Sequence, residues 1–156
     1  MRHPALALFL LLSLAACSGS SSDGITSVPG RGAISIQVVP NPIVATKVSG
    51  ETYDFPFEVV VRETGGRPVT VTNVSVAVNG PLGLNLYEEN WDAARIRSMG
   101  YNPSLAANSE LRMRITPRKE VPDDRLFSSV VAELRVDAVD DGGVSTTATT
   151  SVTVRR

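Results

Sequence analysis

The sequence predicts an all-β fold, a single antiparallel β-sandwich of about seven strands with one short helix in a loop. Two patterns support this prediction. From residue 34 onward, apolar and polar residues alternate with a period of two, as they do in half-buried strands. Clusters of Gly, Pro, Asn and Asp separate these stretches at short intervals. The only cysteine lies near the start of the chain, so an apolar core rather than a disulfide must stabilise the domain.

The first expected strand covers residues 34–38 and ends at the turn formed by residues 40–42. Residues 43–48 are expected to continue it as a short edge piece. The second expected strand covers residues 53–62, where every odd-numbered residue is apolar. Within it, Pro56 lacks an amide hydrogen and indicates an edge position or a bulge.

Residues 63–68 are expected to form a hairpin connection, because Gly65-Gly66 can adopt positive φ angles. In the strand that follows, the apolar positions change parity near Thr72-Asn73. Val69 and Val71 fall on one parity, and the later valines fall on the other. Such a one-residue change predicts a β-bulge.

Residues 82–108 are expected to be mostly irregular, with a short strand over 82–86. Residues 92–99 are predicted to form a short helix, with Asn90 or Asp92 near its N-cap and Gly100 as its stop.

Regular alternation returns at residues 111–115, and a charged loop is expected over 118–125. The strongest hairpin signal joins residues 132–138 to residues 148–154 through the turn at 140–143.

Two stretches carry a resemblance to known modules. The hairpin formed by residues 136–143 and 151–154, and residues 57–66 with the Val/Thr strand that follows, resemble bacterial immunoglobulin-like, PKD-like and cadherin-like modules. The resemblance implies an immunoglobulin-like (Ig-like) sandwich over residues 33–156. The antibody-type Cys…Trp…Cys core and the interdomain calcium motifs of cadherins are absent from the sequence.

The first residues have the layout of a secretory signal. Arg2 is followed by an apolar stretch over residues 5–14, which is shorter than the ~20 residues that span a bilayer. Leu14-Ala15-Ala16-Cys17 resembles the lipobox of bacterial lipoproteins. That resemblance implies removal of residues 1–16 as a signal peptide, a diacylglyceryl group on the Cys17 thiol and an acylated new amino terminus. The alternative is an ordinary secretory signal that leaves Cys17 as a free thiol.

The lipidated Cys17 and the Ser- and Gly-rich stretch over 18–32 form the predicted flexible tether, so residues 17–32 precede the domain. The expected location is the bacterial cell envelope, with a lipid anchor in the membrane. Ser18 favours the outer over the inner membrane, since in lipoproteins of enteric-type bacteria aspartate at that position favours inner-membrane retention.

Composition excludes several kinds of chemistry. Without residues 1–16 the chain also lacks His3, its only histidine, so Ser-His-Asp and Cys-His machinery and histidine or thiolate zinc sites are excluded. We therefore expect no enzymatic activity. The formal charge changes from −1 to −2 with the loss of Arg2, which gives no basis for binding nucleic acid. No cofactor is expected apart from the calcium alternative.

The calcium alternative rests on Asp137, Asp140 and Asp141, which cluster at the last hairpin. Carboxylate oxygens suit Ca²⁺, but a site needs about six to eight oxygens. The competing and favoured interpretation is a tight turn, for which Asp and Gly are the ordinary residues.

A second candidate site consists of Tyr87, Trp91 and Tyr101, which lie among carboxylates and could form an aromatic platform for a glycan or peptide. The favoured alternative is a small satellite core in which Trp91 and Ile96 pack the helix onto the sandwich.

The sequence thus predicts a membrane-anchored envelope lipoprotein that acts as a non-catalytic structural or protein-interaction module. Its expected partners are the membrane, through the lipid anchor, and an envelope protein that contacts its loops or an edge strand. The alternative is a small surface lipoprotein that binds calcium or a glycan. The oligomeric state stays open.

Overall fold

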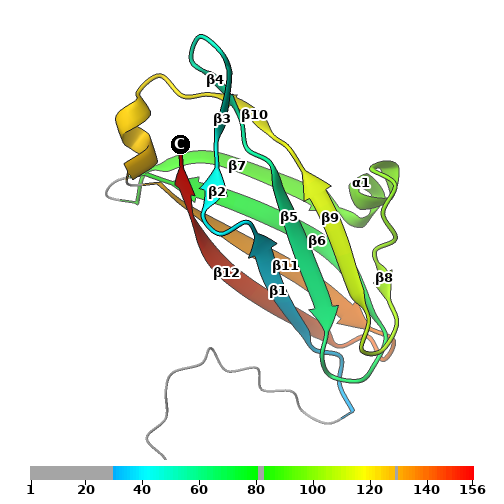
Figure 1. Cartoon of the computed structure of the whole chain (residues 1–156). Helices are drawn as coiled ribbons and strands as arrows, with labels where there is room; N and C mark the ends of the chain where they lie inside the picture. Colours follow the sequence, from blue (N-terminus) through cyan, green and yellow to red (C-terminus); the bar gives the residue numbers. More distant parts are fainter. Residues whose placement is uncertain (1–29, 81–82, 129) are drawn as a thin grey trace, which may run out of the picture.

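The computed structural model of the chain describes residues 30–80, 83–128 and 130–156. Two β-sheets pack face to face, and a small third sheet extends one end of the sandwich (Figure 1). The all-β prediction is therefore confirmed. The predicted signal peptide, Cys17 and the tether up to residue 29 lie outside the described residues.

The first sheet contains three antiparallel strands in the order β1-β5-β9. Their bounds are β1 (Ile34–Val39), β5 (Phe57–Glu63) and β9 (Glu110–Ile115). In β9, Leu111, Met113 and Ile115 are buried, whereas Arg112 and Arg114 between them are exposed. This alternation, which the sequence predicted, directs one face of the sheet into the core.

The second sheet has the strand order β2-β12-β11-β6-β7, and β8 pairs with the beginning of β6. Neighbouring strands are antiparallel except β2 and β12, which run parallel. The predicted strong hairpin is confirmed as β11–β12, in which Leu134 pairs with Thr150. The bounds are β2 (Ile43–Val44), β6 (Val69–Asn79), β7 (Asn85–Asp92), β8 (Ser104–Leu105), β11 (Val131–Asp140) and β12 (Ser145–Arg155).

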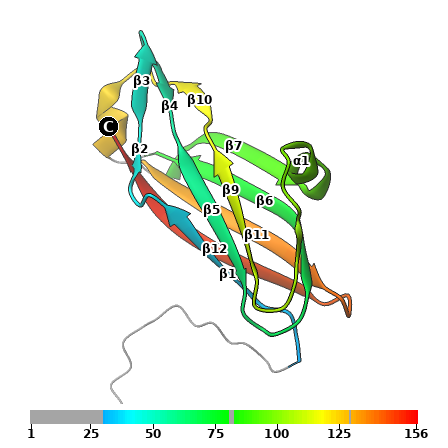
Figure 2. The same ribbon diagram turned by 45° about the vertical axis from the view of Figure 1, so that its right-hand side comes forward.

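This strand order is that of an Ig-like sandwich. In the usual letters, β1, β5 and β9 correspond to strands A, B and E, and β6, β11 and β12 correspond to C, F and G. An added strand, β7, lies beside C, as in variable-type domains. The first segment also divides between the sheets, because β1 pairs with β5 and β2 pairs with β12. Figure 2 shows the first sheet in front of the second.

The predicted β-bulge is confirmed in β6. Asp137 of β11 lies opposite Asn73, and the next residue, Ala138, lies opposite Val71, so Thr72 is the extra residue. Its hydroxyl donates to the backbone carbonyl of Asp137 at 3.1 Å. The bulge keeps the valines on both sides of it facing the core despite their different parity.

The predicted helix is also confirmed, as α1 (Ala93–Ser98). The Asp92 carboxylate accepts a hydrogen bond from the Arg95 amide at 2.7 Å and so caps the helix. After the helix, Gly100 adopts a φ of 89°, a conformation that favours glycine. Trp91 and Ile96 both belong to the main core cluster rather than to a separate satellite core, and the helix packs onto the second sheet.

The predicted hairpin at residues 63–68 is wrong. Strand β5 pairs with β1 and β9, whereas β6 pairs with β11, β7 and β8, so residues 64–68 cross from one sheet to the other. The glycines of this connection indicated a tight turn. Turn chemistry is local, however, and it does not determine which strands become partners.

Two further expectations need correction. The stretch taken as mostly irregular contains β7, which is an eight-residue edge strand rather than a short strand over 82–86. The charged loop over 118–125 instead contributes β10 (Arg118–Glu120) and the start of the 3₁₀ helix η2 (Asp124–Ser128).

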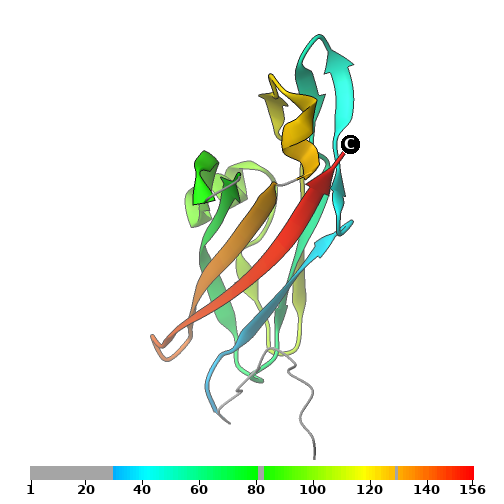
Figure 3. The same cartoon turned by 90° about the vertical axis from the view of Figure 1, so that its left-hand side faces the viewer.

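A small sheet with the order β10-β4-β3 extends one end of the sandwich. Its other strands are β3 (Thr46–Ser49) and β4 (Thr52–Asp54). The expected strand over 53–62 is therefore interrupted at Pro56, between β4 and β5. Figure 3 shows the small sheet and η2 at the same end of the molecule.

Candidate functional site

The two ends of the sandwich are built differently. We call the end formed by residues 30–33, 64–68, 106–109 and 141–144 the closed end, and the end that carries the small sheet and η2 the open end. In Figure 1 the first strand, β1, begins at the closed end, while η2 and the small sheet lie at the opposite end. The two predicted sites are distributed between these regions, and neither forms as predicted.

At the closed end, the Glu63 side chain is buried, with 1% of its surface exposed. Its carboxylate accepts hydrogen bonds from the backbone amides of Gly65 (2.6 Å), Asn108 (2.8 Å), Gly66 (3.0 Å) and Ala33 (3.4 Å). Burial alone would raise the pKa of Glu63, but these four amides together hold it below the ordinary value. One carboxylate therefore joins three separate loops.

Close backbone packing reinforces this connection at Gly65. A Cβ atom at that position would overlap the backbone carbonyl of Arg31. Only glycine therefore lets the crossing between the sheets lie directly against the segment that enters β1.

Asp140, one of the predicted calcium ligands, has the same structural role. Its buried carboxylate accepts hydrogen bonds from the amides of Val144 (2.8 Å), Gly142 (2.9 Å) and Gly32 (3.1 Å). The Val144 amide is the main cause that lowers the pKa of Asp140. Asp140 therefore stabilises the β11–β12 turn and connects it to the segment that leads into β1.

The other two aspartates have partners of their own. Asp137 pairs with Arg135 at 2.8 Å and accepts from the Thr147 hydroxyl at 2.6 Å. Asp141 pairs with Arg67 at 2.6 Å. Over the described residues, no group of three or more His, Cys, Asp or Glu side chains is placed to hold a metal ion. The turn interpretation accounts for this cluster, and the structure does not gather the carboxylates for calcium.

The predicted aromatic platform is also not assembled. Trp91 is 3% exposed and belongs to the core. The Tyr101 hydroxyl accepts from the Arg114 amide at 3.0 Å and lies 3.3 Å from the Arg114 carbonyl, to which it donates. Of the three rings, Tyr87 lines the apolar cavity at the open end, and Trp91 and Tyr101 do not. The structure therefore offers no shared aromatic surface for a glycan.

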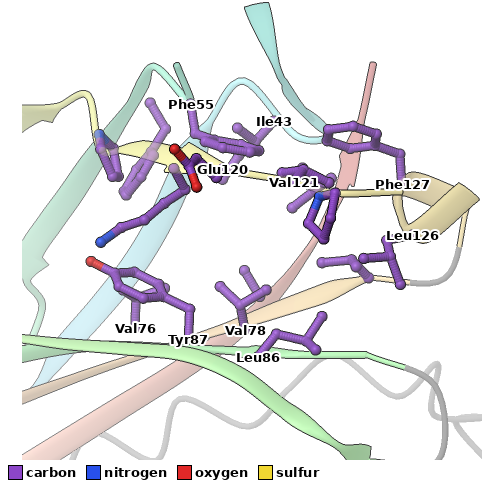
Figure 4. Close-up of a pocket in the computed structure, with 17 residues that line it drawn as sticks. Ile43, Phe55, Val76, Val78, Leu86, Tyr87, Glu120, Val121, Leu126 and Phe127 are labelled. Atoms are coloured by element: carbon purple, nitrogen blue, oxygen red, sulfur yellow. The ribbon is translucent and has the colours of Figure 1, made fainter. Parts of the chain in front are cut away.

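That cavity is the main concave feature of the open end. It has a volume of about 290 Å³ and lies between the two sheets, beneath β10 and η2 (Figure 4). Its lining is mostly apolar and comes from both sheets, from β10 and η2, and from the segment between them. The lining residues are Ile43, Phe55, Phe57, Val76, Val78, Leu86, Tyr87, Pro117, Lys119, Glu120, Val121, Pro122, Leu126, Phe127, Val130, Ala132 and Val154.

An aromatic group holds η2 over this end. The Phe127 ring lies 5.1 Å from the Tyr53 ring in an edge-to-face arrangement and 6.2 Å from the Phe55 ring. The Tyr53 hydroxyl donates to the Asp124 carboxylate at 2.7 Å, and this hydrogen bond is the main cause that raises the pKa of Tyr53. The position of η2 is thus fixed by contacts to β4 and its flank.

Polar groups are few in the cavity lining. The Lys119 ammonium lies 4.0 Å from the centre of the Tyr87 ring, a cation–π contact. The Tyr87 hydroxyl is buried and has no hydrogen-bond partner among the described residues. Such a group is costly, since a buried hydroxyl without a partner lacks the hydrogen bonds that water would supply.

Sequence reasoning named Tyr87 but missed the rest of the cavity lining. The available signal was the apolar pairs Val121-Pro122 and Leu126-Phe127, which stand within or beside an otherwise charged stretch. Apolar residues in such a connection often cover a core, and here they line the open end.

Fold and site together define the class of this protein: an Ig-like β-sandwich with one end closed by buried carboxylates and an apolar cavity at the other. No helix among the described residues combines the length and the apolar character needed to cross a membrane. No protein-family model and no curated protein sequence matches the chain.

Solved structures resemble the fold at low sequence identity. The chain is similar to the Northeast Structural Genomics Consortium target SoR45, with a TM-score of 0.59, 12% identity, and coverage of 79% of this chain and 86% of that one. It is also similar to a Bordetella pertussis protein provisionally designated ApaA, with a TM-score of 0.54, 16% identity, and coverage of 83% and 99%. At these identities the similarity shows the fold alone.

The chain has a weaker similarity to the CARDB domain of the PF1109 protein from Pyrococcus furiosus. Its TM-score is 0.40 at 16% identity, with coverage of 86% of this chain and 99% of that one.

Proposed function

We propose that this protein is a bacterial envelope lipoprotein, anchored by lipid on Cys17, whose Ig-like domain is a non-catalytic interaction module. The observation that carries the proposal is Leu14-Ala15-Ala16-Cys17, which follows a short apolar stretch and precedes a Ser- and Gly-rich segment. Several acyl chains would hold the protein stably, since each buried methylene contributes about 0.8 kcal/mol. Ser18 favours the outer membrane as the location.

The geometry of the domain supports a role at its far end. The described chain enters at the closed end, at residues 30–33, whereas the cavity and η2 lie at the opposite end (Figure 1). A tether attached at residue 30 would therefore leave the open end facing away from the anchor. The open end is the surface that we assign to an envelope partner.

The interaction role fits the residues that remain after signal removal. From residue 18 onward the chain contains neither histidine nor cysteine, so Ser-His-Asp and Cys-His machinery has no candidate residues there. An Ig-like sandwich presents loops at its two ends, where binding residues commonly lie.

The anchor is tested by the intact mass of the membrane-extracted protein, wild type beside Cys17→Ser. The expected wild-type species begins at residue 17 and carries acyl mass, and the Cys17→Ser protein lacks that mass. Ser20→Ala is the matched control, because it changes the tether and leaves the lipobox intact. An unmodified soluble species from wild type would refute the anchor.

The interaction role is tested by site-specific photo-crosslinking in the envelope. A crosslinker at Val48 probes the open end, since this side chain is 45% exposed in β3, and one at Asp141 probes the closed end. A defined protein adduct from position 48 and none from position 141 is expected. The reverse pattern would contradict the assigned surface.

A further inference from the structure

The open-end cavity has the properties of a small binding pocket rather than a packing defect. Both sheets contribute apolar side chains to it, among them Val76 and Ala132 of the second sheet and Phe57 of the first. Its volume of about 290 Å³ is close to the lower end of the range for ligand pockets, about 300 Å³. At roughly 30 Å³ for each water-sized group, it can hold on the order of ten non-hydrogen atoms.

Two hydrogen-bond donors at this cavity, one from β7 and one from β10, lack an acceptor in the part of the chain that the structure describes. The Tyr87 hydroxyl is buried without a partner, and the Lys119 ammonium lies over the same ring. None of the ion pairs among the described residues includes Lys119. A hydroxyl and an ammonium can both donate to one carboxylate, which would form charge-assisted hydrogen bonds.

The other charged residue of the lining limits where an anion can lie. Glu120 is the only acidic residue among those that line the cavity, and it would repel a carboxylate placed beside it. It follows Lys119 directly in β10, and both side chains border the cavity. In Figure 4, Glu120 lies on β10 across the cavity from Tyr87. The Tyr87 side is therefore the favourable position for a negative charge.

We propose that the open-end cavity binds a free medium-chain carboxylate of about eight to ten carbons, with its tail between the sheets and its head group at Lys119 and the Tyr87 hydroxyl. The Lys119 side chain, which is exposed, moves aside from the Tyr87 ring so that the head group reaches the hydroxyl. This inference goes beyond the lipid anchor and the protein partner, and it does not depend on either.

The test is calorimetric titration of the full chain carrying Cys17→Ser, which cannot be acylated, with decanoate as the probe. Decanol is the matched neutral ligand, since it has the same tail without the charge. Decanoate is expected to bind about tenfold more tightly than decanol, because only the carboxylate can pair with Lys119. Equal affinities, or no binding of decanoate, would overturn the proposal.

Two conservative variants separate binding from folding. Tyr87→Phe removes only the hydroxyl that lacks a partner, so the fold should persist while decanoate affinity falls about five- to tenfold. Tyr101→Phe makes the same chemical change outside the cavity and should leave affinity unchanged. Equal affinity in wild type and Tyr87→Phe would exclude the hydroxyl from the site.

Charge variants locate the head group. Lys119→Gln should weaken decanoate binding about fivefold and leave decanol binding unchanged, whereas Glu120→Gln should strengthen decanoate binding. Val78→Phe fills the cavity from β6, where Val78 is half-buried, and should abolish binding of both ligands. Strong decanoate binding by a folded Val78→Phe protein would place the ligand elsewhere.

Discussion

The apolar core of this sandwich is covered by different kinds of side chain at its two ends. At the closed end, two buried carboxylates, Glu63 and Asp140, accept hydrogen bonds from backbone amides of the surrounding loops. At the open end, apolar side chains leave a cavity, and the Tyr87 hydroxyl has no partner among the described residues. The ends therefore differ in how they cover the core, through buried carboxylates at one and around an apolar cavity at the other. A buried hydroxyl without a partner among the described residues occurs at both, on Thr64 and on Tyr87.

The largest effect is expected from breaking the closed end. Glu63→Ala would leave four backbone amides without their acceptor and should cost about 3–5 kcal/mol of unfolding free energy. Urea denaturation measures it. Glu110→Ala is the control, since Glu110 pairs only with the exposed Arg62 and Arg112 and should cost less than about 1 kcal/mol. Similar losses in both variants would contradict the central role of Glu63.

Acid should weaken the closed end in the same way. The folded pKa of Glu63 lies below its ordinary value, although burial opposes this, because four amides stabilise the ionised form. The unfolded chain therefore takes up a proton first, so this stability is complete above about pH 5 and is lost as the pH falls through the folded pKa. The lowered pKa of Asp140, caused mainly by the Val144 amide, acts in the same direction.

Thermal melts from pH 7 to pH 3 in high salt, which screens the surface ion pairs, measure this dependence. Glu63→Gln should be less stable than wild type at pH 7 and should lose less stability on acidification. An equally steep decline in the variant would assign the acid sensitivity to other groups.

A smaller effect is expected at the open end. Phe127→Ala removes a half-buried ring that packs on Tyr53 and Phe55, and it should cost about 1–2 kcal/mol, less than a fully buried phenylalanine would. Urea denaturation beside Glu63→Ala gives the comparison. A larger loss of unfolding free energy than in Glu63→Ala would show that the open end contributes more to stability than the closed end.

The smallest expected effect on stability distinguishes Tyr101, whose hydroxyl is hydrogen-bonded, from Tyr87, whose hydroxyl has no partner among the described residues. Tyr101→Phe breaks hydrogen bonds to the Arg114 backbone and should cost about 1 kcal/mol. Tyr87→Phe removes a hydroxyl without a partner and should be neutral or slightly stabilising, by up to about 1 kcal/mol. Destabilisation by Tyr87→Phe would show that its hydroxyl is satisfied in solution.

The sequence predicted the features of the fold that depend on local pattern. The alternation of residues 132–138 and 148–154 matches β11 and β12, and the change of parity among the β6 valines matches the bulge. Local sequence pattern did not predict which strands pair with each other. The crossing at 64–68 resembled a hairpin because its glycines have local roles, whereas pairing of β5 with β9 joins residues about fifty positions apart, such as Phe57 with Ile115.

Strand β7 was missed for a related reason. It lies at a sheet edge, and only Trp91 among its side chains is fully buried, so its sequence lacks a regular alternation. The cavity was missed because its walls come from distant segments. Phe55 and Phe127 have no pattern that connects them, and only the folded chain brings them within 6.2 Å.

The division of the first segment between the sheets has a mechanical consequence. Strand β1 pairs with β5 over six residue pairs, and β2 runs parallel to the end of β12. A pulling force between residue 30, at the closed end, and the end of β12, at the open end, acts along these strands. The hydrogen bonds between β1 and β5 lie across that direction, so they bear the load together in shear and do not open one after another.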